Sequence, residues 1–331
     1  MSLSPLLTSA AFAPIQNVGW IRVTGSDRVR WLNGMVTNNI QALKPGEGCY
    51  NFFLNAQGRI QGDATAWLLE DSILLETAAD RVPALMATLD RFIIMDDVEL
   101  IPIEHRHGLL LAGPNTNALL ATIDVCTEPI DPMELVHVTW HSTSLDLLNS
   151  HAPIVPHVEF WSDASTIGLL AESLRSAGAI EVTPEDLEQL RILEGTPLYG
   201  TDIRDTDLPQ ETAQTRALHF SKGCYLGQEI VERIRSRGNV HRTFSGFLLH
   251  GDLAPAGTIL TSEGKPTGQL TSITSLNLQL IAQSLQLTDT SLKLALGYIR
   301  REALDRSSPI TYPGGTATPS ALPFQLPESR A

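Results

Sequence analysis

Hydrophobic and polar positions alternate along the chain with the spacings of both helices and strands. Val29, Leu32 and Val36 recur at helical spacing directly after Ser26 and Asp27, either of which can cap a helix. The short apolar stretches that follow are typical of strands, and one stretch among them has helical periodicity. The strands are predicted at residues 49–54, 59–69, 72–76 and 98–103, and the helix at residues 80–92. The pattern indicates a compact α+β unit.

The second half of the chain changes from helices to strands. A helix predicted at residues 166–176 has one apolar face and stops at Gly178. Residues 183–186, Thr-Pro-Glu-Asp, form a capping box and predict the start of another helix. From about Phe244 onward, short apolar stretches are separated by turns rich in glycine, proline and serine. We expect a C-terminal all-β domain there, in the form of a small barrel.

Length and charge narrow the possible functions. The chain has 331 residues, enough for two or three domains of about 100–200 residues each. It contains 23 Lys and Arg against 37 Asp and Glu, for a net charge of −14. Because non-specific DNA binding depends on clustered cations, this surface excludes it, and we expect no direct DNA binding.

The three cysteines, Cys49, Cys126 and Cys224, include no Cys-x-x-Cys pair, so their spacing predicts neither a zinc site nor an iron–sulfur site. Such a sparse, odd number suits a reducing compartment, and we expect Cys49 and Cys126 to be either core residues or incidental ones. No apolar run reaches the ~18 residues of a membrane span. No Lys or Arg precedes Arg22, which argues against a secretion signal. We therefore expect a cytoplasmic protein with no metal site and no membrane contact.

Positive charge is concentrated between Arg216 and Arg242. This window holds six Lys and Arg but only two Glu, so it carries +4 while the rest of the chain carries −18. Such a window can attract an anionic ligand. It can equally be a solvated helix face with pairs such as Glu229 and Arg233. The charge alone leaves both interpretations open.

Cys224 lies inside this window, in the sequence Ser-Lys-Gly-Cys-Tyr-Leu-Gly-Gln-Glu at residues 221–229. A helix is expected to begin near Gly227 or Gln228. A thiol close to a helix N-terminus and two positions from Lys222 is favoured as the thiolate. The alternative is that Cys224 is a small buried hydrophobic residue.

The run at residues 222–229 resembles the signature of the YgfZ-type folate-binding proteins, as does Leu-Pro-Gln-Glu at residues 208–211. The resemblance extends over nearly the whole chain. Residues 24–32 look like the first strand-to-helix turn of that family, and residues 54–60 look like its hairpin. The glycine pattern of residues 257–298 is similar to the C-terminal barrel of the related glycine-cleavage aminomethyltransferases.

This resemblance implies an α+β, three-lobed aminomethyltransferase-like fold with a C-terminal β-barrel. Its central cavity would accept tetrahydrofolate or a derivative as the cofactor. Residues 1–48 and 105–240 would form a discontinuous folate-binding domain, residues 49–104 an inserted α+β domain, and residues 241–331 the barrel.

The resemblance also assigns two carboxylates. Glu159, in His-Val-Glu-Phe-Trp, matches the glutamate that holds the pterin ring, because a carboxylate can accept two parallel N–H bonds. Its alternative is an ordinary acid at a strand edge. The aminomethyltransferases carry a catalytic aspartate in an Asp-Asp pair, where this chain has Gly62 and Asp63. Asp63 either orients a folate nitrogen or belongs to the polar face of a strand.

Other candidate residues follow from the same resemblance. Lys222 and Cys224 would act together, the thiol in redox or transfer chemistry and the lysine in support of its thiolate. Further candidates for binding folate are Arg191, unless it points outward, together with Tyr225 and Gln228. In the basic window, Arg235 and Arg237 either meet the folate glutamate tail or another anion, or are solvated surface.

The resemblance implies a tetrahydrofolate-binding accessory factor for the maturation or repair of iron–sulfur proteins, which would be its partners. An effect on tRNA modification would arise through such client enzymes. The alternative is an enzyme, a tetrahydrofolate-dependent aminomethyltransferase or methyltransferase of the glycine-cleavage type. The cysteine run and the missing first aspartate argue against that alternative. A module that binds RNA through the basic window is weaker still, since no RNA-binding motif is present.

Overall fold

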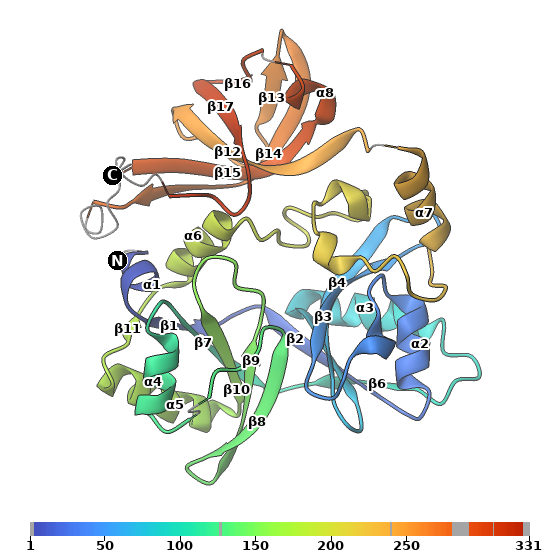
Figure 1. Cartoon of the computed structure of the whole chain (residues 1–331), viewed down its shortest axis with the longest axis vertical. Helices are drawn as coiled ribbons and strands as arrows, with labels where there is room; N and C mark the ends of the chain where they lie inside the picture. The colour runs from blue at the N-terminus through green and yellow to red at the C-terminus, as the bar shows by residue number, and fades with distance from the viewer. Residues whose placement is uncertain (1–2, 126–127, 239, 280–290, 307, 327–331) are drawn as a thin grey trace.

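The computed structural model describes residues 3–125, 128–238, 240–279, 291–306 and 308–326, so Cys126 lies outside it. Two β-sheets with their helices lie side by side, and a closed barrel lies across one end of them (Figure 1). This is the expected mixed fold with a C-terminal barrel.

The six-stranded sheet combines the N-terminal strand with strands from the middle of the chain, in the order β11-β1-β7-β10-β9-β8. Its strands are β1 (Ala11–Ile15), β7 (His107–Ala112), β8 (Glu134–Trp140), β9 (Thr143–Asn149), β10 (His157–Ser162) and β11 (Ile180–Glu181). Helices α4 (Thr116–Thr122) and α5 (Ala164–Ser176) pack against Phe12 and Phe160 of this sheet through four buried leucines, Leu119, Leu120, Leu170 and Leu174. The helix predicted at residues 166–176 is α5.

The five-stranded sheet has the order β3-β4-β5-β2-β6 and packs against helices α2 (Arg28–Met35) and α3 (Val82–Asp90). Its strands are β2 (Val18–Thr24), β3 (Gly48–Leu54), β4 (Ile60–Leu68), β5 (Ile73–Ala78) and β6 (Glu99–Ile103). The four strands predicted between residues 49 and 103 are therefore present.

The expected domain boundary at residue 49 does not separate two units, because residues on both sides of it belong to this sheet and its core. Strand β2 pairs with both β5 and β6, and Ile21 of β2 and Leu32 of α2 are buried in the same core as Leu75. Because a strand and a helix cannot bury these side chains elsewhere, the unit that contains residues 49–104 also contains residues 18–43. The division into three domains stays a prediction.

Two predicted helix caps have different outcomes. Asp27 is the N-cap residue of α2 but makes no side-chain cap; its carboxylate instead accepts the N–H of Asp97 at 3.0 Å. Ser26 likewise donates its hydroxyl to Asp97. The loop before β6 therefore uses the groups that were expected to cap the helix. At α6 (Pro184–Glu194), by contrast, Thr183 and Asp186 form the predicted capping box.

The barrel is closed by strands in the order β12-β15-β14-β13-β16-β17. Phe247, Leu270 and Ile299 are buried in its core. Its strands are β12 (Arg242–Gly251), β13 (Ile259–Ser262), β14 (Lys265–Asn277), β15 (Ser291–Arg300), β16 (Thr311–Tyr312) and β17 (Gly315–Ser320). In the sequence, helix α7 (Gln228–Arg237) precedes β12, and helix α8 (Arg301–Leu304) follows β15.

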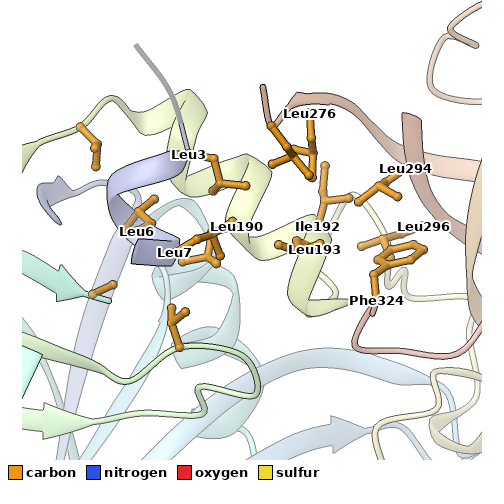
Figure 2. Close-up of a cluster of buried hydrophobic side chains, with 14 of the residues drawn as sticks. Leu3, Leu6, Leu7, Leu190, Ile192, Leu193, Leu276, Leu294, Leu296 and Phe324 are labelled. Atoms are coloured by element: carbon orange, nitrogen blue, oxygen red, sulfur yellow. The ribbon is translucent and has the colours of Figure 1, made fainter. Parts of the chain in front are cut away.

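Helix α6 joins the barrel to the six-stranded sheet. Leu190 and Leu193 of α6 pack in one buried cluster with Leu6 of α1 (Ser4–Thr8) and with Leu294 and Leu296 of the barrel (Figure 2). Burial of a leucine stabilises a fold by roughly 1.5–3 kcal/mol relative to exposure. This shared core fixes how the barrel sits on the sheets.

The two sheets meet through tryptophans. Trp20 of β2 contacts Trp161 of β10 edge to face, with ring centroids 5.0 Å apart, and both belong to a buried cluster with Trp67 of β4. This contact brings β5 of one sheet and β10 of the other close together.

Candidate functional site

The cysteine motif is a loop that packs on helix α2 and on the β3–β4 hairpin. The Lys222 ammonium donates hydrogen bonds to the carbonyl oxygens of Asn33, Val36 and Asn38, at 2.6, 2.7 and 2.5 Å. These carbonyls lie at and just beyond the C-terminal end of α2, where carbonyl groups lack helical partners and a cation is favourable. Burial lowers the pKa of Lys222 to about 8, so at neutral pH the group is mostly protonated and can donate all three bonds.

Cys224 is exposed at the surface of this loop. In the part of the chain that the structure describes, no group hydrogen-bonds to its sulfur, and the hydrogen bonds of Lys222 go to carbonyls. The geometry therefore gives Lys222 a role in holding the loop, and its support of a thiolate stays a prediction. Cys49, which was expected to be either a core residue or an incidental one, is half-buried, and burial raises the pKa of its thiol to about 11.

Tyr225 and Gln228 help to fold the same loop. Tyr225 is buried in a cluster with Tyr50 and Ile60, and its backbone N–H donates to the Gln228 side chain at 3.3 Å. Gly227 has φ +81°, and a Cβ there would lie 2.6 Å from a backbone oxygen of the hairpin. The predicted helix begins at Gln228. The contacts of these residues are structural, and a role in binding folate stays a prediction.

Asp63 lies in a polar cluster with Tyr50 and Arg216. The Tyr50 hydroxyl donates to the Asp63 carboxylate at 2.6 Å, and the Arg216 guanidinium lies 4.3 Å from the centre of the Tyr50 ring. Burial raises the pKa of Asp63 to about 6, although the Tyr50 hydrogen bond and the Arg216 charge oppose this rise. Asp63 can therefore hold or release a proton near neutral pH.

Glu159 is half-buried on β10, and two neighbouring side chains donate hydrogen bonds to its oxygens. The Ser150 hydroxyl donates to Oε1 at 2.6 Å, and the Trp161 indole N–H donates to Oε2 at 3.0 Å. Glu76 of β5 approaches it across the contact between the sheets. Burial and the charge of Glu159 raise the pKa of Glu76 well above its usual range, and the two carboxyl groups are hydrogen-bonded to each other.

Two histidines complete this region. His157 is buried and contacts the Ser150 hydroxyl through Nε2 at 2.9 Å. Burial lowers the pKa of His157 and of His151 to about 4, so both rings are neutral at pH 7. Because Ser150 gives its proton to Glu159, Nε2 of His157 must donate, and Nδ1 is then an acceptor. Nδ1 has no hydrogen-bond partner among the described residues.

Arg216 connects the two carboxylate clusters. Its charge acts on Asp63 and Tyr50 and also on His151, which lies close enough to His157 to influence its titration. The structure thus brings Asp63 and Glu159 to one polar region at the junction of the sheets. The described residues contain no group of side chains suited to hold a metal ion.

Sequence reasoning missed several members of this region. Arg216 was noticed only as part of the basic window, and His157 only as a neighbour of Glu159. Tyr50, Glu76 and Ser150 carry no motif, because their importance depends on contacts between distant strands.

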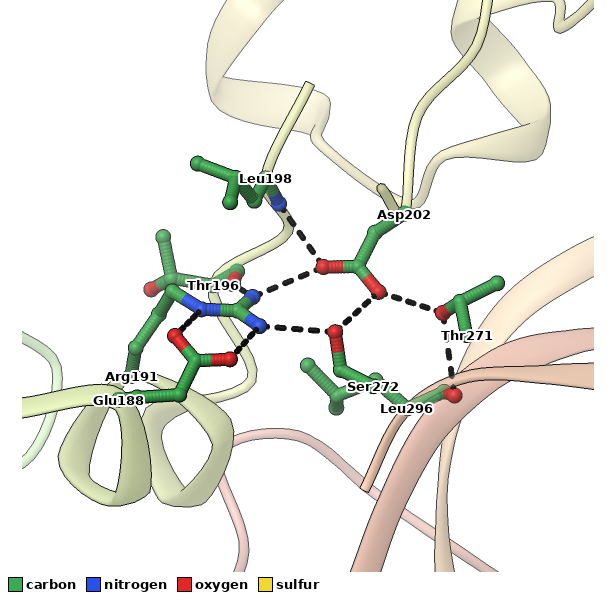
Figure 3. A network of polar contacts seen from close by, with 8 residues as sticks. All are labelled: Glu188, Arg191, Thr196, Leu198, Asp202, Thr271, Ser272 and Leu296. Carbon is green, nitrogen blue, oxygen red and sulfur yellow. Dashed lines mark hydrogen bonds and ion pairs between the residues drawn. The ribbon is translucent and has the colours of Figure 1, made fainter. Parts of the chain in front are cut away.

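Arg191 makes a different set of contacts from the expected one. Its guanidinium binds both oxygens of Glu188, the fully buried Asp202 at 2.8 Å and the Ser272 hydroxyl at 2.8 Å (Figure 3). Asp202 also accepts hydrogen bonds from Thr271 and Ser272 of the barrel. Arg191 therefore ties α6 to the barrel, and we do not place it among the ligand-binding residues.

The basic window does not form one surface. Arg235 stacks on Phe220 at 4.4 Å, and Arg242 is paired with the buried Asp207 and Glu211. The side chain of Arg237 lies outside the described part of the chain.

Comparison with known proteins places these features in a family. The model of the GCVT N-terminal domain matches residues 6–222. An iron–sulfur cluster assembly factor IBA57 homolog, mitochondrial, from Neurospora crassa is 27% identical over 70% of this chain and 52% of its own length. A tRNA-modifying protein YgfZ from Hamiltonella defensa is 26% identical over 66% of this chain and 64% of its own length.

The fold itself matches a solved structure. The glycine cleavage system aminomethyltransferase T from Bartonella henselae superposes with a TM-score of 0.81, over 99% of this chain and 90% of that protein, at 20% identity. In the described part of this chain, no helix is long and apolar enough to cross a membrane.

Proposed function

This chain belongs to the GCVT N-terminal domain family, and from that premise we propose that it is a tetrahydrofolate-binding accessory factor for iron–sulfur proteins. The names of two relatives support the proposal, one an iron–sulfur cluster assembly factor and the other a tRNA-modifying protein. Because this chain spans only 52% and 64% of their lengths, the activities of those whole proteins are part of the proposal.

The orientation of Glu159 is the observation that carries the folate proposal. The Ser150 hydroxyl and the Trp161 N–H donate to different oxygens of Glu159 and so orient the carboxylate. Glu76 is hydrogen-bonded to Glu159 as well, so a ligand that binds both oxygens would take the place of Glu76 there. The 2-amino-4-oxo edge of a pterin presents two parallel N–H groups, which fit such a carboxylate. Burial and the charge of Glu159 raise the pKa of Glu76, which favours its neutral form beside the ligand.

Asp63 would lie near the reactive nitrogens of the bound cofactor. Reduced folate carries one-carbon groups on N5 and N10, and a carboxyl with a pKa of about 6 can exchange a proton there. The neutral imidazoles of His151 and His157 add no charge to this region, so Arg216 and Arg81 supply positive charge that acts on Asp63.

Cys224 supports the accessory role through its exposure. A thiol at the surface can reach a client protein, whereas a thiol inside the folate cavity could not. In this proposal, the folate site and the thiol act on a partner that contains or acquires an iron–sulfur cluster.

Calorimetric titration with tetrahydrofolate, under reducing and anaerobic conditions, tests the folate site. We expect saturable one-to-one binding, weakened about tenfold or more by Glu159→Gln, as for a lost charge-assisted hydrogen bond of ~1.5–3 kcal/mol. Glu172→Gln, on the exposed face of α5, is the matched control and should bind as the wild type does. Equal affinity in Glu159→Gln would move the pterin site elsewhere.

A second function, aminomethyl transfer, is favoured by the retained Asp63 and by the fold. In that case the protein would transfer the methylene carbon of an aminomethyl donor to tetrahydrofolate, with release of ammonia and of the protonated donor. Asp63→Asn would abolish this turnover. Binding of tetrahydrofolate without turnover supports the accessory factor instead.

A further inference from the structure

A cavity of about 240 Å³ opens between the barrel and the loop of residues 204–207. The loop contributes Arg204 and Asp207 to its lining, and the barrel contributes Arg242, Tyr298 and Arg300. None of the residues proposed above to bind folate lines this cavity, which we term the barrel cavity. Three guanidinium groups and the carboxylate of Asp207 line it, in a chain of net charge −14.

Arg242 is held rigidly in the wall. One of its terminal nitrogens, Nη2, binds Asp207 at 2.6 Å and Glu211 at 3.1 Å, and Nε binds Glu211 at 3.2 Å. Asp207 is itself fixed, since it also accepts hydrogen bonds from the Tyr298 hydroxyl and the Arg204 backbone. Nη1 of Arg242 has no partner among the residues that the structure describes, so a preorganised N–H donor is available.

The other two arginines are not neutralised in this way. Arg300 lies directly across from Arg242 in the β12–β15 pair, where like charges destabilise a sheet. Its ion pair with Glu302, at 3.7 Å, joins two side chains that are about 60% exposed and therefore stabilises little. Arg204 is exposed, and its guanidinium has no partner within the described ranges.

The remaining wall is apolar. Ile259 at the rim is 46% exposed although it is a large aliphatic residue, and Pro266 and the Tyr298 ring lie beside it. An apolar wall next to three guanidinium groups fits a ligand that combines an anionic head with an apolar body. The cavity volume is below the ~300–1,000 Å³ typical of sites for drug-sized molecules, which limits that body to about one ring.

We propose that the barrel cavity binds a small organic anion, a carboxylate or phosphate joined to a single apolar ring. Arg242 supplies the fixed donor, and Arg204 and Arg300 close over the anionic head. The site is separate from the folate site at Glu159, so its occupancy does not depend on the proposed function.

Phenyl phosphate is a suitable probe, with phenol and inorganic phosphate as its separated halves. Calorimetry on the full chain should show saturable one-to-one binding of phenyl phosphate, and the affinity should fall as salt concentration rises. Arg204→Gln and Arg300→Gln should each weaken binding about tenfold, as for a charge-assisted hydrogen bond at a partly exposed site. Arg91→Gln, which replaces an exposed arginine next to α3 and the five-stranded sheet, should leave the affinity for phenyl phosphate unchanged.

Three results would overturn the proposal. One is the lack of saturable binding by the wild-type protein. Another is unchanged affinity in the double variant Arg204→Gln/Arg300→Gln, whose exposed side chains are not needed for folding. The third is displacement of phenyl phosphate by tetrahydrofolate together with loss of binding in Glu159→Gln, which would place the probe in the folate site.

Discussion

Replacement of Lys222 by methionine should destabilise the whole fold, and not only change the chemistry of Cys224. Methionine keeps the length of the side chain but removes three hydrogen bonds to the carbonyls of Asn33, Val36 and Asn38. A hydrogen bond to a charged group is worth about 1.5–3 kcal/mol. Since Lys222 is only half-buried, water can replace part of these bonds, and we expect a total loss of about 2–4 kcal/mol.

Denaturant unfolding, followed by circular dichroism, measures this loss as a lower transition midpoint. Cys224→Ser is the matched control, because the neighbouring side chain is exposed and its replacement should change the free energy of unfolding by less than about 0.5 kcal/mol. If Lys222→Met unfolded like the wild type but slowed alkylation of Cys224, the lysine would serve the thiol, and the role assigned to it here would be wrong.

Three further changes test other parts of the structure. Gly227→Ala should lower the thermal midpoint by several degrees, because its Cβ would clash with hairpin backbone at φ +81°, whereas Gly223→Ala, with nothing within 4 Å, should leave the midpoint unchanged. The pKa of Asp63 is about 6 in the folded protein, above its ordinary value, so its ionisation lowers the free energy of unfolding as pH rises from about 4 to 6. Asp63→Asn should remove that part of the pH dependence in unfolding titrations. Arg191→Met should cost about 3–5 kcal/mol in the same assay, since it leaves the buried Asp202 without its cation, and a loss below 1 kcal/mol would contradict this.

Local signals in the sequence predicted most of the secondary structure. The capping box at Thr183 and the stop at Gly178 each lie at the end of a real helix, because both depend on neighbouring residues only. The same holds for the start of α7 at Gln228 and for the hairpin between β3 and β4. The strands β8 and β9 were not predicted, since their exposed positions interrupt the apolar pattern.

Long-range contacts could not be predicted in this way. The pairing of β2 with β5 and β6 depends on which strands meet after collapse, and no local pattern carries that information. Lys222 is a similar case, because its partners lie more than 180 positions earlier in the chain. The resemblance to a family correctly indicated the overall fold, but the partners of Glu159 became visible only in three dimensions.

A crystal structure of the protein grown with tetrahydrofolate under anaerobic conditions would test the central claim most directly. We predict that the pterin ring binds with its 2-amino edge against the two oxygens of Glu159, while its N5 side faces Asp63. Tetrahydrofolate bound away from Glu159, or no bound ligand at saturating concentration, would contradict the account.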